Sequence, residues 1–239
     1  MKSFEFKEID AEGIETLEAI ANADKFNEWM FETIRPYCKG KILEVGSGIG
    51  NISEFFINNK YDIVLSDVRD NYCDILSQKF NNSVVLLDLV DDDFDTRYKD
   101  ILGTCDTVFA LNVVEHIKDD GLAIRNCKKL LRTDGNLVIL VPSYQLLYNR
   151  FDEELEHYRR YNRTGLNALI TNSDLKLIHS QYFNFAGIFG WILSGSILKK
   201  KTIPAGQMRL YNYLVPIFKI VDKIMFNRMG LSVISVGKK

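Results

Sequence analysis

A glycine-rich turn directly after a short apolar segment is the feature that most constrains the fold of this chain. Residues 42–50 read Ile-Leu-Glu-Val-Gly-Ser-Gly-Ile-Gly, so three glycines stand at alternate positions after a strand expected over 41–45. Glycine lets the backbone turn tightly and approach a ligand without a colliding Cβ atom. The pattern therefore predicts a strand, a turn that holds a nucleotide-like ligand, and a helix over 51–59.

Strand and helix signals alternate along the middle of the chain, which is typical of a parallel sheet with crossover helices. Further strands are expected over 61–66, 83–87, 106–111, 136–141, 175–182 and 231–236, and further helices over 71–80, 119–131 and 166–171. We expect Asp134-Gly135 to form the turn that ends helix 119–131. We expect the acidic stretch over 88–95 to be a solvated loop. The fold class predicted is α/β, with a Rossmann-like, mostly parallel seven-stranded sheet and helices on both faces.

The length of 239 residues suits one sizeable core, and a single domain is expected. Within it we expect an N-terminal helical cap over 1–40, with one or two helices over 11–37, and a Rossmann-like core over 41–183. An apolar and basic helical insertion over 184–230 and a last strand over 231–239 complete the chain. The apolar run 185–198 is too short and too rich in Gly and Ser to span a bilayer. We interpret it as a buried helix pair over the active-site side.

Charge is distributed unevenly although the net charge is only −2, a value that argues against a nucleic-acid partner. Residues 184–239 hold nine Lys or Arg and one acid, a net of +8, so residues 1–183 carry −10. A basic, apolar surface suits an anionic substrate or peripheral contact with an acidic membrane face, and a folded subdomain with solvated lysines fits equally well. We expect charge reversal at 199–201 to weaken such contacts. The N-terminus lacks the apolar core of a signal peptide and the four cysteines are scattered, so a cytoplasmic location is expected.

Two details of the glycine turn distinguish between nucleotides. A dinucleotide fingerprint needs glycine at position 51, where this chain has Asn51. Glu44, two residues before the first glycine, would repel a pyrophosphate but attract the ammonium group of a methionine moiety. Both details disfavour an NAD-dependent dehydrogenase and favour a cationic sulfonium ligand.

The segment Glu44-Val-Gly46-Ser-Gly48-Ile-Gly50 resembles the E/DxGxGxG loop of class I S-adenosylmethionine (SAM)-dependent methyltransferases. The resemblance implies that the loop lines the amino-acid part of SAM. Asp67, at the end of the next strand, can accept both ribose hydroxyls, and the resemblance places the residues at 88 and 89 on the adenine. The predicted cofactor-binding residues are Glu44, Gly46, Ser47, Gly48, Gly50, Asn51, Asp67, Val68, Asp88, Leu89, Asn112 and Trp29.

Trp29 and Asn112 enter that set through two further segments. Residues 26–29, Phe-Asn-Glu-Trp, resemble the helix that closes over SAM in a subgroup of these enzymes, and Trp29 would stack near the cofactor or else belong to the core. Residues 109–117, Phe-Ala-Leu-Asn-Val-Val-Glu-His-Ile, resemble the family's strand-four motif, which passes under the transferable methyl group. Asn112 lies inside this motif.

Two histidines are predicted to be catalytic. Methyl transfer needs an aligned nucleophile more than strong acid–base help, but a hydroxyl acceptor profits from a general base. His116 follows the strand-four motif, and His157 lies just after the fifth strand, whereas His179 falls within a strand and is expected to be structural. Glu115 and His116 are two adjacent ligands, which are too few to define a metal site, so no metal ion is predicted.

Residues 157–161, His-Tyr-Arg-Arg-Tyr, resemble the HYRRY-type segment of bacterial methyltransferases often linked with polysaccharide and glycan biosynthesis. Guanidinium groups bind carboxylate or phosphate bidentately, so Tyr158, Arg159, Arg160 and Tyr161 are predicted acceptor contacts. They would alternatively cap the next helix or pair with the acids at 152–154. The predicted activity is SAM-dependent O-methylation of a small anionic, glycan-type or lipid-linked acceptor, with S-adenosylhomocysteine as product. N-methylation of an amino sugar and a non-catalytic SAM-binding module remain alternatives.

Overall fold

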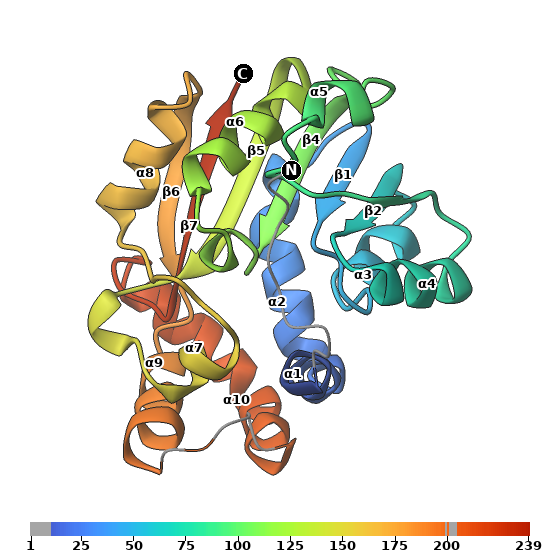
Figure 1. The fold of residues 1–239 in the computed structure, drawn as a ribbon. Helices are drawn as coiled ribbons and strands as arrows, with labels where there is room; N and C mark the ends of the chain where they lie inside the picture. The colour runs from blue at the N-terminus through green and yellow to red at the C-terminus, as the bar shows by residue number, and fades with distance from the viewer. Residues whose placement is uncertain (1–10, 199, 201–204) are drawn as a thin grey trace.

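The computed structural model describes residues 11–198, 200 and 205–239, and its centre is a seven-stranded sheet in the order β3-β2-β1-β4-β5-β7-β6 (Figure 1). Strands β1 to β5 pair in parallel, whereas β7 is antiparallel to both β5 and β6. The prediction of a Rossmann-like, mostly parallel seven-stranded sheet is therefore confirmed. The strands are β1 Ile42–Val45, β2 Ile63–Asp67, β3 Val84–Leu86, β4 Cys105–Leu111, β5 Leu131–Pro142, β6 Lys176–Phe183 and β7 Ser232–Lys238.

Helices cover both faces of this sheet, and α1 and α2 precede it (Figure 1). The α-helices are α1 Ala11–Ala21, α2 Asp24–Ile34, α3 Ser53–Asn58, α4 Asp70–Lys79, α5 Phe94–Arg97, α6 Asp120–Leu130, α7 Arg150–Glu154, α8 Arg163–Thr171, α9 Gly187–Trp191 and α10 Ala205–Ile224. Short 3₁₀ turns are η1 Arg35–Tyr37, η2 Val114–His116 and η3 Gln145–Leu147, and η4 Ile192–Ile197 is a π-helical continuation of α9.

The two faces of the sheet carry separate apolar clusters. Helices α2, α3, α4 and α10 pack on one face, with Phe31, Phe56 and Val215 among the buried residues. Helices α6 and α8 cover the other face with Ile124 and Leu166. Because both faces are covered, β1 is buried along its whole length, which explains why its sequence is continuously apolar except for one acid.

The end of helix α6 differs from the sequence prediction. The helix ends at Leu130, and β5 begins at once because Leu131 pairs with Cys105 of β4. The ε-ammonium of Lys239 donates hydrogen bonds to the carbonyls of Lys128 and Leu131, which satisfies part of the helix end. Asp134-Gly135 consequently lies inside β5, where the strand register shifts, and does not form the helix-end turn.

Two predictions about irregular segments are also wrong. The acidic stretch is not all solvated loop, since it contains α5, and Asp91 is buried in an ion pair with Arg97 (2.6 Å). The apolar run 185–198 is not a buried helix pair: it forms α9 and η4, and five of its large apolar side chains are exposed. These are Phe189, Ile192, Leu193, Ile197 and Leu198.

Helix α10 follows in the insertion between β6 and β7 and lies with α9 at the lower end of the molecule (Figure 1). Among the described residues, none of the helices has the length and apolarity needed to cross a membrane. Lys199 and Lys201, predicted to take part in acceptor or vesicle binding, lie outside the described residues.

The strand order reverses between β1 and β4. Ligands of open α/β sheets bind outside the carboxyl ends of the strands at such a reversal, because the crossover connections leave in opposite directions there. The loops that follow β1, β2 and β4 meet at this edge.

Candidate active site

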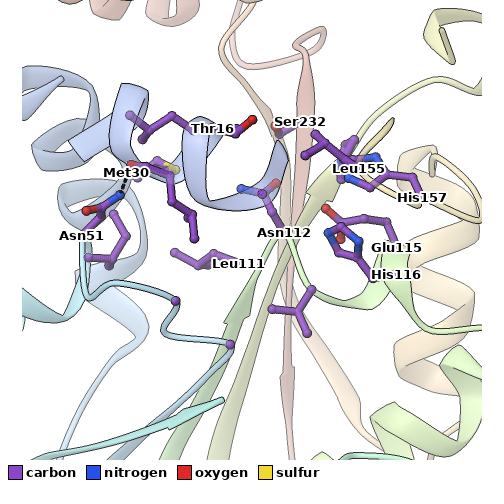
Figure 2. Close-up of a pocket in the computed structure, with 18 of the residues that line it drawn as sticks. Thr16, Met30, Asn51, Leu111, Asn112, Glu115, His116, Leu155, His157 and Ser232 are labelled. Carbon is purple, nitrogen blue, oxygen red and sulfur yellow. Dashed lines mark hydrogen bonds between the residues drawn. The ribbon is translucent and has the colours of Figure 1, made fainter. Parts of the chain in front are cut away.

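A cavity of about 640 Å³ lies at the carboxyl ends of the parallel strands. Its lining comes from the loops after β1, β2, β3 and β4, from α1 and α2, from α7 and the segment after it, and from α9 and α10. Figure 2 shows Thr16, Met30 and Asn51 on one side of it, and Glu115, His116 and His157 on the other. Asn112, which follows β4, lies between the two groups. The cavity thus has two chemically different ends.

The glycine turn forms the wall at the end of β1. Gly46, Gly48 and Gly50 all have positive φ angles, of 70°, 55° and 83°. A Cβ atom at Gly46 would lie 2.4 Å from Cγ2 of Val113, so the turn can approach the strand-four segment only because this side chain is absent. Gly50 lies outside the cavity lining, and a Cβ atom there would collide with the ring of Phe80. Its role is close helix packing behind the turn.

Glu44 and Asp67 are buried carboxyl groups on either side of this turn. Glu44 accepts a hydrogen bond from the Ser53 hydroxyl, and burial raises the pKa of its carboxyl to about 7. Asp67 accepts hydrogen bonds from the backbone N–H groups of Gly48 (2.9 Å) and Arg69 (3.1 Å). Burial raises the pKa of Asp67 as well, and these N–H groups counteract the rise. Both groups line the cavity and can offer oxygens to a cation or to hydroxyls.

The remaining lining at this end is mixed polar and apolar. Asp88 follows β3, where its Oδ1 accepts from the Val90 N–H (2.8 Å) and its own N–H donates to the Tyr98 hydroxyl (2.9 Å). Apolar and small side chains flank it. The other predicted cofactor residues in the lining are Ser47, Val68 and Leu89, together with Asn112, which has a φ of 55°.

The N-terminal helices close this end of the cavity. The Asn51 side chain donates a hydrogen bond to the carbonyl of Leu17 (2.9 Å), which ties α1 to the glycine turn. Trp29 does not line the cavity: it is 6% exposed and packs against Phe183, with ring centroids 4.4 Å apart. Met30, its neighbour on α2, reaches the cavity instead. The sequence offered no signal for choosing between adjacent apolar residues of one helix.

A carboxyl group and two imidazoles form the opposite end. Glu115, His116 and His157 each contribute one atom to a group within 4.8 Å of one another. The two rings meet edge to face, with centroids 4.5 Å apart. Burial raises the pKa of Glu115 to about 8, and burial together with the nearby His157 lowers the pKa of His116 to about 3. His116 is therefore neutral at physiological pH. The sequence prediction named both histidines as catalytic, whereas it considered Glu115 only as one of two adjacent metal ligands that were too few for a site.

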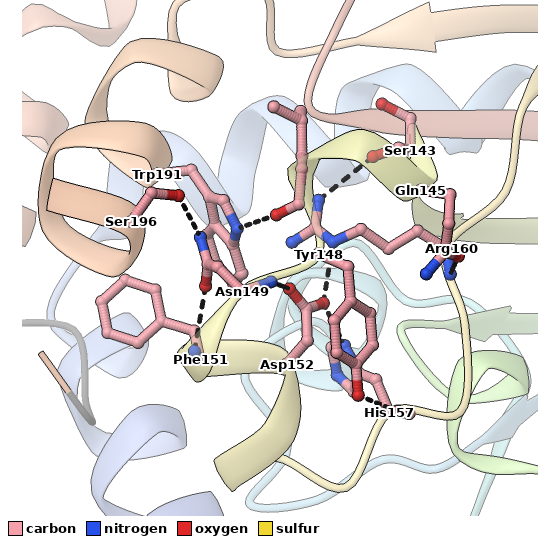
Figure 3. Close-up of polar contacts among 11 residues, drawn as sticks. Ser143, Gln145, Tyr148, Asn149, Phe151, Asp152, His157, Arg160, Trp191 and Ser196 are labelled. Atoms are coloured by element: carbon pink, nitrogen blue, oxygen red, sulfur yellow. Dashed lines mark hydrogen bonds and ion pairs between the residues drawn. The ribbon is translucent and has the colours of Figure 1, made fainter. Parts of the chain in front are cut away.

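His157 is held from behind by a buried ion-pair network (Figure 3). Its Nδ1 lies 2.8 Å from Oδ1 of Asp152, and Nε of Arg160 donates to the same oxygen at 2.7 Å. Arg160 also donates to the carbonyl of Ser143 (3.1 Å) and lies over the ring of Trp191 (4.5 Å). Burial alone would raise the pKa of Asp152, but the contacts from His157 and Arg160 lower it below its usual value. The carboxyl is thus ionised and accepts the Nδ1 proton of His157.

The four predicted acceptor contacts have different surroundings. Tyr158 is half-exposed and lines the cavity, and Arg160 lines it while paired with Asp152. Arg159 and Tyr161 lie outside the lining, where both bond to Oδ2 of Asp120, at 2.7 and 2.9 Å. Three of the four side chains are therefore already engaged within the protein.

Comparisons with known proteins agree with this geometry. Residues 43–139, from β1 to β5, match a family model described as a methyltransferase domain. A SAM-dependent methyltransferase from Archaeoglobus fulgidus has a similar structure, with a TM-score of 0.56 at 17% identity over 89% of this chain and 94% of that one. The chain has a methyltransferase fold.

Two further methyltransferase structures are similar. A putative methyltransferase from Bacillus halodurans gives a TM-score of 0.57 at 13% identity over 87% of this chain and 98% of that one. Phosphoethanolamine N-methyltransferase 2 of Haemonchus contortus, solved in complex with SAM, gives 0.62 at 16% identity over 97% of this chain and 57% of that one. The domain match and the fold support a SAM-dependent methyltransferase with SAM as its cofactor.

One curated relative has a similar sequence, the highly reducing polyketide synthase rstn3 of Aspergillus nomiae. It is 28% identical over 120 residues, which are 44% of this chain and 5% of that protein. This chain therefore matches only a small part of the curated relative.

Proposed function

We propose that this protein transfers the methyl group of SAM to an oxygen atom of an anionic, glycan-type or lipid-linked acceptor. The observation that carries the proposal is the division of the cavity into two ends. The glycine turn with Glu44 and Asp67 forms a donor end suited to SAM, and the Glu115, His116 and His157 side chains form an acceptor end suited to an oxygen nucleophile.

At the donor end, the chain supplies negative charge and a close backbone. SAM, when bound, supplies a methyl electrophile on a cationic sulfonium. Glu44 and Asp67 favour a cationic ligand over a pyrophosphate, because the buried carboxyl groups repel an anionic ligand. The positive φ angles of Gly46 and Gly48 allow the ligand to lie directly on the backbone.

At the acceptor end, His157 is oriented as a general base. Asp152 accepts the Nδ1 proton, so Nε2 carries the lone pair that can take a proton from an acceptor hydroxyl. As the new oxygen–carbon bond forms and the carbon–sulfur bond breaks, the electron pair stays on sulfur and the hydroxyl proton passes to the imidazole. The neutral ring of His116 lies beside it and can accept a hydrogen bond from a different polar hydrogen of the acceptor, such as that of a neighbouring hydroxyl.

The anionic, lipid-linked character of the acceptor is inferred from the insertion between β6 and β7. Helix α10 presents an exposed apolar stripe at helical spacing, formed by Leu210, Tyr213, Ile217, Ile220 and Ile224. Its opposite side carries Met208 and Tyr211, which line the cavity. Residues on α9 divide in the same way, because Trp191 lines the cavity while Phe189 is exposed.

Basic side chains accompany this apolar surface. Lys200, Arg209, Lys223 and Arg228 are exposed, and the whole segment 184–239 carries a net charge of +8. A surface that combines exposed apolar residues with cations suits an anionic lipid bilayer, since lipid chains cover the apolar stripe and headgroups attract the cations. The helices that would lie on the bilayer also form the cavity wall, so an acceptor anchored in lipid would be near the acceptor end.

Methyl transfer is tested with labelled SAM and a panel of acidic sugars, carboxylic acids, phenols and amino sugars. Label in an oxygen-containing acceptor supports the proposal. Label only in amines would overturn it in favour of N-methylation. SAM binding without S-adenosylhomocysteine formation on any acceptor class would favour the non-catalytic module.

Membrane contact is tested by co-sedimentation with vesicles of anionic or zwitterionic lipid. We expect binding to anionic vesicles that weakens with salt and is lost in the Ile217→Glu/Ile220→Glu double variant, while Ile75→Glu on α4 binds as the parent does. Equal sedimentation of all three proteins would overturn this part of the proposal. If the parent does not bind vesicles but forms dimers, and the double variant does not form them, the apolar stripe contacts a second copy of the chain instead.

A further inference from the structure

The Glu115 carboxyl group is buried with little to compensate it among the described residues. The residue is fully inaccessible to solvent, and neither carboxyl oxygen has a hydrogen-bond partner on another of the described residues. Native proteins rarely bury a carboxyl group in this way, because the charge of nearby Arg160 offsets only part of its desolvation. The group lines the cavity beside His116 and His157, so its oxygens face two further groups that carry lone pairs.

Both imidazoles are fixed so that one nitrogen remains for another ligand. Nδ1 of His157 bonds to Asp152, which leaves Nε2. The His116 ring makes one hydrogen bond to the backbone of Leu155, which leaves its other nitrogen. The backbone N–H of Tyr158 donates to the carbonyl of Glu115 (2.8 Å), which joins the two chain segments that carry these groups. Histidines that ligate metals are usually held in this way by a carboxylate or carbonyl on the second nitrogen.

We propose that Glu115, His116 and His157 together bind a divalent cation of the Zn²⁺ type, with at least one coordination position open to the cavity. One carboxylate and two imidazoles suit Zn²⁺ and similar first-row cations, whereas Mg²⁺ and Ca²⁺ prefer oxygen ligands alone. Three protein ligands are the set found in catalytic zinc sites, where a fourth position holds water or substrate. The ligand atoms lie within 4.8 Å of one another, close enough to converge on one ion.

The inference rests on the proposed function and narrows its acceptor class. A cation at the acceptor end would bind the acceptor oxygen and lower the pKa of a hydroxyl, whose proton would leave to solvent before the methyl group arrives. The favoured acceptors are therefore hydroxy acids, neighbouring hydroxyls of a sugar, or phenols. With a cation bound, Nε2 of His157 would be a ligand and would no longer serve as the base, and the cation would take over the activation of the hydroxyl.

The test measures cation binding directly. Protein stripped with a chelator is titrated with ZnCl₂ or MgCl₂ by calorimetry, and Co²⁺ is bound separately because its visible absorption reports nitrogen and oxygen ligation. We expect one Zn²⁺ per chain, little affinity for Mg²⁺, and at least a tenfold weaker Zn²⁺ affinity in Glu115→Gln and in His157→Asn. His179→Asn, a change on β6 outside the cluster, should bind as the parent does, and so should Cys73→Ser, which removes a partly accessible thiol.

Folding and function are separated by two further measurements. Unchanged SAM affinity in Glu115→Gln shows that this variant is folded, so loss of Zn²⁺ binding then reflects the lost ligand. Absence of stoichiometric binding in the parent, or equal affinity in parent and both cluster variants, would overturn the inference. Zn²⁺ binding without methyl transfer to any acceptor would refute the proposed function but not the cation site. Methyl transfer by chelator-treated, metal-free protein would refute a role of the cation in methyl transfer but not the proposed function.

Discussion

Replacing Arg160 by methionine tests whether the HYRRY block is a structural support or an acceptor clamp. Arg160 is buried, with its side chain 1% exposed, and it pairs with Asp152, whose side chain is 0% exposed. Methionine keeps much of the aliphatic volume that packs against Trp191. It removes the guanidinium group, so the buried Asp152 charge keeps its hydrogen bond to His157 but loses its ion pair. Removing one partner of a buried ion pair costs about 3–5 kcal/mol. Because His157 still bonds to Asp152, we expect the free energy of unfolding to fall by about 3 kcal/mol, the lower end of this range.

The neighbouring Arg159 provides the matched control. It pairs with Asp120 at the same distance of 2.7 Å, but its side chain is 31% exposed and that of Asp120 is 21% exposed. Ion pairs in contact with solvent contribute at most about 1 kcal/mol, so Arg159→Met should be nearly neutral for stability. Equilibrium unfolding in urea gives both values, and for a chain of this size about 3 kcal/mol lowers the thermal midpoint by roughly 6–12 °C. If the two variants unfold within 1 kcal/mol of each other, burial does not decide the strength of these pairs and the reasoning is refuted.

Three other predictions concern the donor end. Gly46→Ala should abolish SAM binding measured by calorimetry, because the new Cβ atom would collide with Val113. Gly103 also has a positive φ, but a Cβ atom there would have no neighbour within 4 Å. Gly103→Ala should therefore lose only about 1–2 kcal/mol of stability and retain SAM binding. SAM affinity should rise as pH increases through about 7, because the Glu44 carboxyl is neutral below its raised pKa and charged above it. A SAM affinity that does not change with pH in the parent would contradict this. So would an equal pH dependence of SAM affinity in Glu44→Gln. S-adenosylhomocysteine at 100 times its Kd should raise the free energy of unfolding by about 2.7 kcal/mol, and NAD at the same concentration should not.

The positions of the strands along the chain were predictable because their signals are local. A buried parallel strand is a short apolar run bounded by turn residues, and β1 and β2 have that pattern. Helix α6 was predicted too long because its end depends on Leu131 pairing with Cys105 from a distant part of the chain. The surface of the insertion was also mispredicted, since α9 and α10 are apolar on two sides and only packing decides which side is buried.

The glycine turn, Glu44, Asp67 and Asp88 could be found from the sequence alone, because each lies at or just after the carboxyl end of a strand and parallel strands bring these ends to one edge. The acceptor end could be found only in part, because the sequence indicated His116 and His157 but not that they meet Glu115. Glu115 and His157 meet only because the segment after β5 folds back onto the segment after β4, and no periodicity records that contact. Likewise, the rotation of α2 on the sheet decides that Trp29 packs in the core and that its neighbour Met30 reaches the cavity. Sequence therefore indicated the cofactor-binding residues, which lie at strand ends, and only the tertiary structure brought together Glu115, His116 and His157, because their meeting depends on how two loops pack against each other.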